Sequence, residues 1–316
     1  EPKTSIQGHI TGAMSSLGKL VSSPIGRMLS SKSSRDRQHR VASSPGIESA
    51  TGIDQRPEDG SIGIECIDYG KGRTERTRLP SVETLLAHPK PEWAEHRWIN
   101  IEGLHPFVIN ELRKAYGFHT LAAEDALHTP QRPKLELYEN HCLVIVEMAR
   151  LENDQLVKEQ VSFMVMDGTL ITFQERPGDI WDPVRKRIKK PESRFHNHGI
   201  WYLVYALIDA VVDNIFPILE NYGDALADLE EQAMDDPQPS VQQNIYIIKR
   251  ELYGLRRSMW PLRELAAKLT SDESLPVDKE TRVFLRDVQD HAVQIIELVD
   301  SSREMANSLQ DFYIST

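Results

Sequence analysis

The chain has 316 residues, of which 40% are hydrophobic and 27% charged, a composition typical of a globular protein with room for two domains. Its net charge of −11 argues against a nucleic-acid partner for the folded part. Cys66 and Cys142 are not spaced as a metal-binding or redox pair, so we expect free, buried thiols.

The N-terminal stretch differs from the rest of the chain. It is rich in Ser and Gly, and up to Gly46 it carries seven basic and two acidic side chains, a net charge of +5. Few large apolar side chains are present to offset the entropy of ordering it. The sequence therefore predicts a flexible, basic, Ser-rich tail over residues 1–60. A solvated linker is favoured over a segment that contacts anionic lipid headgroups.

From about Ile62 the pattern changes to short strands. Strands over 62–69 and 73–79 flank a Gly-Lys-Gly turn, and strands over 155–166 and 169–173 flank the tight-turn pair Asp167-Gly168. Residues 143–146 are hydrophobic without alternation, which is typical of a strand covered on both faces. Short helices near these strands can supply the covers. The sequence predicts an α/β/α layered domain with a mixed sheet over residues 61–195.

From about His196 the pattern is helical to the end of the chain. Two long antiparallel helices are expected over 196–234 and 240–269, separated by a Pro-rich turn and kinked at Pro217 and Pro261. The most apolar stretch, 201–219, is interrupted by Asp209 and Asp213, so we expect a core helix there and not a membrane span. Residues 196–316 thus form a long helical region.

The last helix carries one apolar stripe with alternating steps of three and four: Leu285, Val288, Ala292, Ile295, Val299, Ser302, Ala306, Leu309 and Tyr313. This heptad pattern fits either a long core helix or a homo-oligomeric coiled coil. We expect Leu285, Ile295 and Leu309 to need partners from further copies of the chain. The pattern is still in register at Tyr313, so we expect the natural chain to continue beyond Thr316.

No catalytic signature is present, and an enzyme is therefore not expected. His196 and His198 read as a surface pair. Three groups of carboxylates stand out: Glu124 with Asp125, Asp209 with Asp213, and Asp287 with Asp290 beside His291. Oxygen ligands without cysteine suit hard cations such as magnesium or calcium. Taken one at a time, each group is better explained as a solvated helix surface or a salt bridge along a helix.

Several motifs together resemble those of the CorA magnesium transporters, in the same order along about residues 62–316. They are His-Thr-Pro-Gln-Arg-Pro-Lys-Leu-Glu at 128–136, Tyr-Glu-Asn at 138–140, Glu-Gln-Val-Ser at 159–162, Phe-Gln-Glu at 173–175, Asp-Pro-Val-Arg at 182–185, Leu-Ile-Asp-Ala at 207–210, Met-Trp-Pro-Leu-Arg at 259–263 and Arg-Asp-Val-Gln-Asp-His at 286–291. Residues 1 to about 60 carry no such resemblance.

The resemblance implies a homopentamer in the cell membrane, with this region in the cytoplasm as the gating and metal-sensing part. It implies that the last helix is a stalk leading into membrane helices and a Gly-Met-Asn selectivity loop, which this sequence lacks. The implied ion, both transported and regulatory, is magnesium, with cobalt as a further candidate. No nucleic acid or small-molecule substrate is implied.

The resemblance also assigns metal ligands. It implies that Asp125, with Glu124 beside it, faces Asp287 of the next subunit across a regulatory site. It implies that Asp209 belongs to a second site nearby and that Asp311 belongs to an acidic ring at the cytoplasmic mouth of the pore. Two alternatives stay open: a zinc transporter of the ZntB type on the same fold, and a soluble metal-responsive oligomer without a pore.

Overall fold

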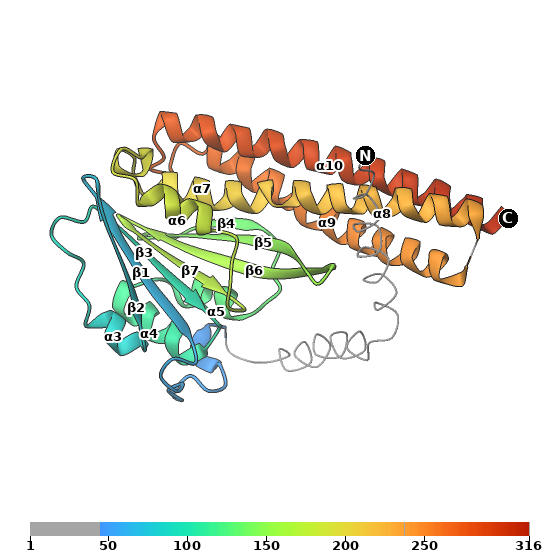
Figure 1. Cartoon of the computed structure of the whole chain (residues 1–316). Helices are drawn as coiled ribbons and strands as arrows, with labels where there is room; N and C mark the ends of the chain where they lie inside the picture. Colours follow the sequence, from blue (N-terminus) through green and yellow to red (C-terminus); the bar gives the residue numbers. More distant parts are fainter. Residues whose placement is uncertain (1–44, 237, 316) are drawn as a thin grey trace, which may run out of the picture.

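The structure is a computed structural model that describes residues 45–236 and 238–315. One sheet carries short helices on one face, and the long helices, together with the short helix Asp182–Ile188, cover the other (Figure 1). In chain order the elements are η2 (Ile47–Ser49), β1 (Gly63–Gly70), β2 (Arg73–Leu79), α3 (Val82–Leu86), β3 (His96–Glu102), α4 (Pro106–Tyr116), α5 (Thr120–Leu127), β4 (Lys134–Leu137), β5 (Cys142–Glu152), β6 (Gln155–Met166), β7 (Thr169–Gln174), α6 (Asp182–Ile188), η3 (Arg194–His196), α7 (Ile200–Asp213), α8 (Ile215–Asp235), α9 (Pro239–Ser271) and α10 (Lys279–Ser315).

The seven strands form one mixed sheet in the order β2-β1-β3-β7-β6-β5-β4, which confirms the predicted mixed α/β architecture. Strands β3 and β7 pair in parallel, and the hairpins β1/β2, β5/β6 and β6/β7 are antiparallel. The β6/β7 hairpin turns at Asp167-Gly168, as predicted. Gly168 has φ +63°, a left-handed conformation that glycine adopts without steric cost.

Strand β5 is covered on both faces, as its uninterrupted hydrophobic run predicts. Leu143 and Ile145 belong to the core under α4 and α5, whereas Val144 and Val146 belong to the core under the long helices. All four side chains have no exposed surface. The sheet therefore separates two hydrophobic cores, and groups on α5 and on α7 lie on opposite faces of it (Figure 1).

The predicted helix over 196–234 is divided into α7 and α8 at Asn214. The break lies one helical turn before Pro217, whose ring excludes a continuous hydrogen-bond ladder there. Among the described residues, one helical segment, Ile200–Asp235, is long and apolar enough to cross a membrane, and 67% of its most apolar window is buried inside the fold. This burial agrees with the predicted core helix.

The apolar stripe of α10 is buried within the same chain. Leu285, Ile295 and Leu309 have exposed fractions of 0%, 0% and 5%, because α10 packs along α9, α7 and α8. The expectation that these side chains need partners from further copies is therefore wrong. A different stripe stays exposed: Leu298, Met305 and Phe312 follow one another at steps of seven residues with 40%, 48% and 38% exposure.

Arg282 joins the C-terminal end of α9 to the start of α10. Its guanidinium group donates to the backbone carbonyl oxygens of Leu269, Thr270, Asp272, Leu275 and Val277, at 2.8–3.4 Å. The last carbonyl groups of a helix have no partner inside that helix, so one cation here satisfies several of them. The α9–α10 connection is consequently fixed by side-chain contacts as well as by the turn.

Residues 45–60, predicted as part of a flexible tail, fold onto the sheet domain. Ile47 is fully buried, and its backbone N–H donates to Thr120 Oγ1 at 3.2 Å. The tail prediction is wrong for these residues, because one buried isoleucine and its backbone contacts outweigh the polar composition around it. Residues 1–44 lie outside the described residues. The predicted boundary near residue 195 stays a prediction.

Candidate metal centre

The clearest candidate centre joins α7 to α10. Asp209 and Asp213 lie one turn apart on α7, and His291 on α10 faces them, so that one ligand atom from each lies within 4.8 Å of the others. His291 Nδ1 lies 3.1 Å from Asp213 Oδ1. The ring of His291 also packs edge-on against Phe216, with centroids 5.8 Å apart. Two carboxylates and an imidazole therefore converge, and within the described residues neither carboxylate forms an ion pair with a lysine or arginine.

Asp209 is the member of this group whose ionised form is disfavoured by its surroundings. Burial, and then the nearby charge of Asp213, raise the pKa of the Asp209 carboxyl group to about 6, although His291 and Arg187 act in the opposite direction. The Asp209 carboxylate accepts a long hydrogen bond from Tyr205 Oη, at 3.4 Å. A bound cation would stabilise the ionised form that burial disfavours.

Asp287 lies one turn before His291 on α10 and is exposed. Its charge contributes to the raised pKa of Asp209, so the two carboxylates are electrostatic neighbours within one chain. The structure thus brings together Asp209 and Asp287 from the predicted set, and adds Asp213 and His291 to them.

Asp125 and Glu124 occupy a different environment on α5. Asp125 Oδ2 forms an ion pair with Lys134 Nζ at 2.6 Å, and its Oδ1 accepts from Gln131 Nε2 at 3.1 Å. Glu124 Oε2 accepts from the backbone N–H of Gly46 at 2.6 Å, and its Oε1 lies 3.7 Å from His128 Nδ1. Both carboxylates already have protein partners in the single chain.

The single chain does not assemble the whole predicted set. Helices α5 and α10 lie on opposite faces of the sheet, so Asp125 and Asp287 of one chain do not converge (Figure 1). Asp311 is exposed near the end of α10, 24 residues beyond Asp287, which corresponds to about 36 Å along a helix. A shared site for Asp125 and Asp287 needs two copies of the chain.

The ligand set of the α7–α10 centre fits a divalent ion after a small adjustment. Ligand atoms on one tetrahedral ion at about 2.1 Å lie roughly 3.4 Å apart, closer than the 4.8 Å limit here. Rotation of the exposed Asp213 side chain can supply this difference. Imidazole nitrogen suits zinc or cobalt, whereas magnesium prefers oxygen and keeps several of its waters.

A second geometric cluster, Cys66 with Asp68 and His88, is a poor metal site. Arg97 already binds both oxygens of Asp68, at 2.7 and 2.8 Å. Burial raises the pKa of the Cys66 thiol to about 12, so the thiolate form that a metal needs is suppressed. This cluster is an ion pair inside the core beside a protonated thiol.

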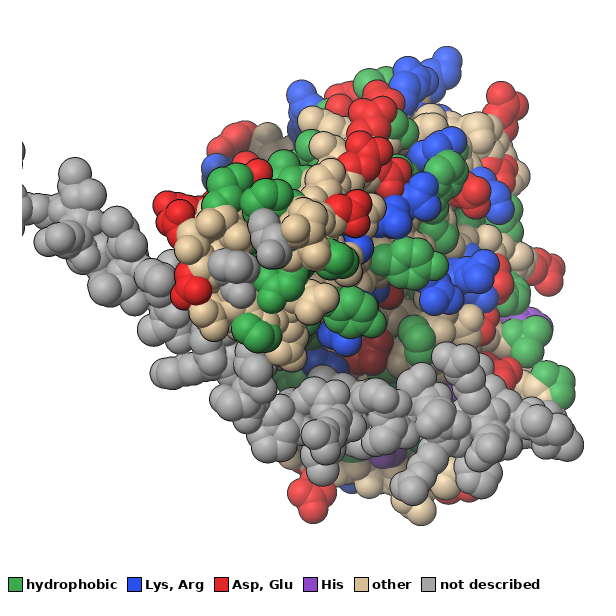
Figure 2. Space-filling view, turned by 90° about the vertical axis from the view of Figure 1, so that its right-hand side faces the viewer, with side chains coloured by type: hydrophobic (Ala, Val, Ile, Leu, Met, Phe, Trp, Pro, Cys, Tyr) green, Lys and Arg blue, Asp and Glu red, His purple; other side chains and the backbone are tan. Residues whose placement is uncertain are grey.

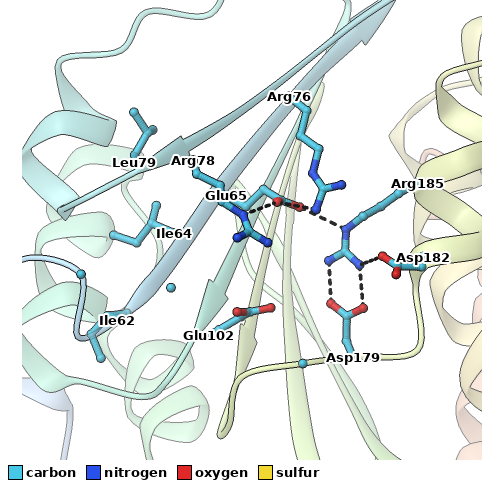
Figure 3. A pocket seen from close by; sticks show the side chains of 13 residues that line it. Ile62, Ile64, Glu65, Arg76, Arg78, Leu79, Glu102, Asp179, Asp182 and Arg185 are labelled. Carbon is cyan, nitrogen blue, oxygen red and sulfur yellow. Dashed lines mark hydrogen bonds and ion pairs between the residues drawn. The ribbon is translucent and has the colours of Figure 1, made fainter.

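A cavity of about 400 Å3 beside β2 is lined by charged side chains that mostly bind one another (Figure 3). Glu65, buried in β1, receives Arg76 at 2.7 Å and Arg185 at 3.1 Å. Arg185 also binds Asp179 with both arms of its guanidinium group, at 2.6 Å each. These pairs link α6 to the sheet, and their function is structural.

The sequence singled out all three members of the α7–α10 centre, but as two separate groups. The four-residue spacing of Asp209 and Asp213 on an apolar helix was a signal, whereas the pairing of Asp213 with His291 spans 78 positions. The expectation of a surface pair at His196 and His198 is wrong for His196, which is 8% exposed and whose Nε2 lies 2.9 Å from the Ile188 carbonyl oxygen.

A family model described as CorA-like Mg2+ transporter protein matches residues 93–316. The chain is 35% identical over 256 residues to the cobalt/magnesium transport protein CorA of Thermotoga maritima, which covers 80% of this chain and 72% of that protein. It is also 20% identical over 216 residues to the zinc transport protein ZntB of Yersinia enterocolitica, covering 68% and 65% of the two chains.

Solved structures share the fold. The soluble domain of CorA from Methanocaldococcus jannaschii superimposes with a TM-score of 0.68 at 21% identity, over 82% of this chain and 98% of that one. The cytoplasmic domain of ZntB from Vibrio parahaemolyticus gives a TM-score of 0.60 at 16% identity, over 80% and 97%. Because the family model covers most of the described residues, the chain belongs to the CorA-like Mg2+ transporter protein family, a family of divalent cation transporters.

Proposed function

We propose that the chain is the cytoplasmic gating and metal-sensing part of a divalent cation channel of the CorA type, with magnesium or cobalt as its ion. In this proposal Asp125 and Glu124 of one subunit face Asp287 of the next, and an ion bound between them favours the closed homopentamer. Asp209 lies in the neighbouring centre, and Asp311 lies at the end of the stalk that leads to the membrane.

The observation that carries the proposal is the convergence of Asp209, Asp213 and His291, with Asp287 one turn away, between α7 and the stalk helix α10. Without a cation these carboxylates repel one another, and the raised pKa of Asp209 reflects burial first and then that repulsion. An ion bound here would reverse the repulsion, and so bias the position of the helix that carries Asp287 and Asp311.

The energies are sufficient for a switch. A site that only the closed state offers, at ten times its dissociation constant, contributes about 1.4 kcal/mol. Five such sites in a pentamer give about 7 kcal/mol, which exceeds the ~5.5 kcal/mol that shifts an equilibrium from 1:99 to 99:1. Weak individual sites are useful for this purpose, because they empty when the free ion concentration falls.

Exposed apolar side chains support self-association. Leu298, Met305 and Phe312 form a stripe on α10, and Tyr246, Tyr253 and Trp260 form a second stripe with the same seven-residue spacing on α9. Helices α9 and α10 lie side by side (Figure 1). Seen from the free end of the helices, hydrophobic side chains lie exposed among charged ones (Figure 2). A second copy is the natural cover for regularly spaced stripes of this kind.

The test of the proposed function is magnesium-dependent protection of the chain. Millimolar magnesium should raise the melting temperature and slow proteolysis of α10, and sodium at matched ionic strength should not, since screening differs from coordination. Asp125→Asn or Asp287→Asn should each remove most of this response, and the double variant should lose little more, because one site is destroyed twice. Intact protection in the double variant would refute the assignment of this site.

A zinc transporter of the ZntB type is the second candidate, because His291 places a nitrogen ligand in the α7–α10 centre. The similarity to ZntB proteins agrees with it. His291→Gln distinguishes the two functions. It should weaken zinc binding at least about tenfold, and leave magnesium binding nearly unchanged, since magnesium takes oxygen ligands. If zinc binding and magnesium binding weakened equally, the imidazole of His291 would not contribute to ion selectivity.

A further inference from the structure

A basic cavity lies between the loop at residues 130–134, strands β5 and β6, and helix α9. Its volume is about 700 Å3, and its charged lining consists of Arg132, Lys134, Lys158 and Arg257 against one acid, Glu147. The whole chain has a net charge of −11, so this lining opposes the overall charge of the protein. A cavity lined by one sign of charge concentrates ligands of the other sign.

The partners of these side chains show which cations remain uncompensated. Glu147 Oε1 is already bound by Lys158 Nζ at 2.7 Å and by the Ser258 hydroxyl group. Lys134 pairs with Asp125, as described above. Within the described residues, however, Arg132 and Arg257 have no ion-pair partner, and both are exposed. Two guanidinium groups therefore line the cavity with their charge unneutralised.

The loop that carries Arg132 is anchored to the sheet. The backbone N–H of Gln131 donates to Gln160 Oε1 at 2.6 Å, and Gln160, in β6, is 4% exposed. Pro130 and Pro133 on either side fix the backbone φ angle. Arg257 is carried by the rigid helix α9. Both guanidinium groups are thus presented from ordered backbone, which lowers the entropy lost when a ligand binds.

We propose that this cavity binds a multiply charged phosphate, such as the phosphate chain of a nucleoside triphosphate. Guanidinium groups match phosphate oxygens with paired, parallel hydrogen bonds, and Arg132 and Arg257 offer two such groups. The volume exceeds what a single phosphate fills. The cavity beside β2 in Figure 3 is different, because its buried arginine is already bound by Asp179 and Glu65.

Isothermal titration of the whole chain with tripolyphosphate tests the proposal. EDTA is present, so the result does not depend on any metal site. We expect binding in the submillimolar range, and at least about tenfold weaker binding of sulfate at matched ionic strength, since fewer phosphate-type contacts form. Arg132→Gln combined with Arg257→Gln should weaken tripolyphosphate binding at least tenfold. Arg250→Gln combined with Lys279→Gln removes the same charge elsewhere and should leave binding unchanged.

Three results would overturn the proposal. Tripolyphosphate and sulfate could bind equally, which indicates general charge attraction. Tripolyphosphate binding could weaken equally in the two double variants, which would also indicate general charge attraction. Alternatively, tripolyphosphate could fail to bind while the Arg132 and Arg257 variant alone lost self-association in sedimentation. The cavity would then hold an acidic segment of a second copy and not a phosphate. Circular dichroism of each variant verifies that the fold is retained.

Discussion

The two acidic sites on opposite faces of the sheet differ in what compensates their negative charge. On α5, Asp125 is neutralised within the chain by Lys134 at 2.6 Å. Between α7 and α10, Asp209 has no basic ion-pair partner within the described residues and carries a pKa raised to about 6, chiefly by burial. A cation that arrives at the first site competes with a lysine, and one that arrives at the second competes with a proton. In the proposed function, one ion would therefore be sensed through two chemistries.

The largest expected effect is on the free energy of unfolding and concerns residues 45–60, which pack against α5. Ile47→Ala should lower the free energy of unfolding by about 3 kcal/mol, because it opens a cavity at a fully buried position. Urea unfolding measures the change, with Ile53→Ala, at a less buried position, as the control. A loss below about 0.5 kcal/mol would mean that the segment contributes little to the packing beneath Glu124.

A smaller effect is expected from pH at the α7–α10 centre. The pKa of Asp209 is raised to about 6 from an ordinary value of 3.8, so the folded state binds its proton more tightly than the unfolded chain does. The free energy of unfolding should therefore fall as pH rises from 4 to 6. Because a metal ion displaces this proton, apparent metal affinity should rise about tenfold between pH 5 and 7.

Thermal melts at fixed ionic strength, with and without metal, measure both changes. Asp209→Asn should flatten the pH dependence and lose the pH-dependent part of the metal response, because it removes the titrating carboxylate. A wild-type metal response that is identical at pH 5 and 7 would contradict competition between metal and proton at this residue.

The smallest effect is expected at the α5 site. Burial lowers the pKa of Lys134, but the hydrogen bonds to Asp125 and Glu136 outweigh it, so the pKa is raised overall. Lys134→Gln should cost about 1 kcal/mol of unfolding free energy and should increase the magnesium response that depends on Asp125. Lys114→Gln, which breaks a 2.7 Å pair at a more exposed position, is the matched control. A weaker magnesium response in Lys134→Gln would show that the lysine assists binding.

Local patterns in the sequence predicted the parts of the fold that depend on neighbouring residues. The Asp167-Gly168 turn and the uninterrupted run in β5 were interpreted correctly, since turn chemistry and two-sided burial leave a local pattern. Heptad spacing predicted which side of α10 is apolar but not what covers it, because periodicity is the same for a partner within the chain and one from another copy. The stripe with Leu285 and Ile295 is covered by this chain, and the one with Met305 is not.

The candidate site was harder to predict, because its members come from distant positions. The sequence singled out the α7 carboxylates as a pair, but their neighbour His291 lies 78 positions beyond Asp213. Burial of Ile47 was missed for a similar reason, since its contact with Thr120 spans 73 positions and its surroundings are polar. The overall composition of a segment does not reveal a single buried side chain within it.

The hydrogen bonds that Arg282 donates at the α9–α10 connection have a mechanical consequence. A guanidinium group keeps its charge at all ordinary pH values, so the hydrogen bonds of Arg282 at this end of the α9–α10 hairpin do not depend on the protonation of the acidic sites. Asp287 and Asp311 lie 5 and 29 residues beyond Arg282 on the same uninterrupted helix. If α10 tilts about that fixed end, Asp311 moves about six times as far as Asp287, because distance along a helix is proportional to residue number. The stalk is then a lever that converts a sub-ångström shift at one end into several ångströms at the other.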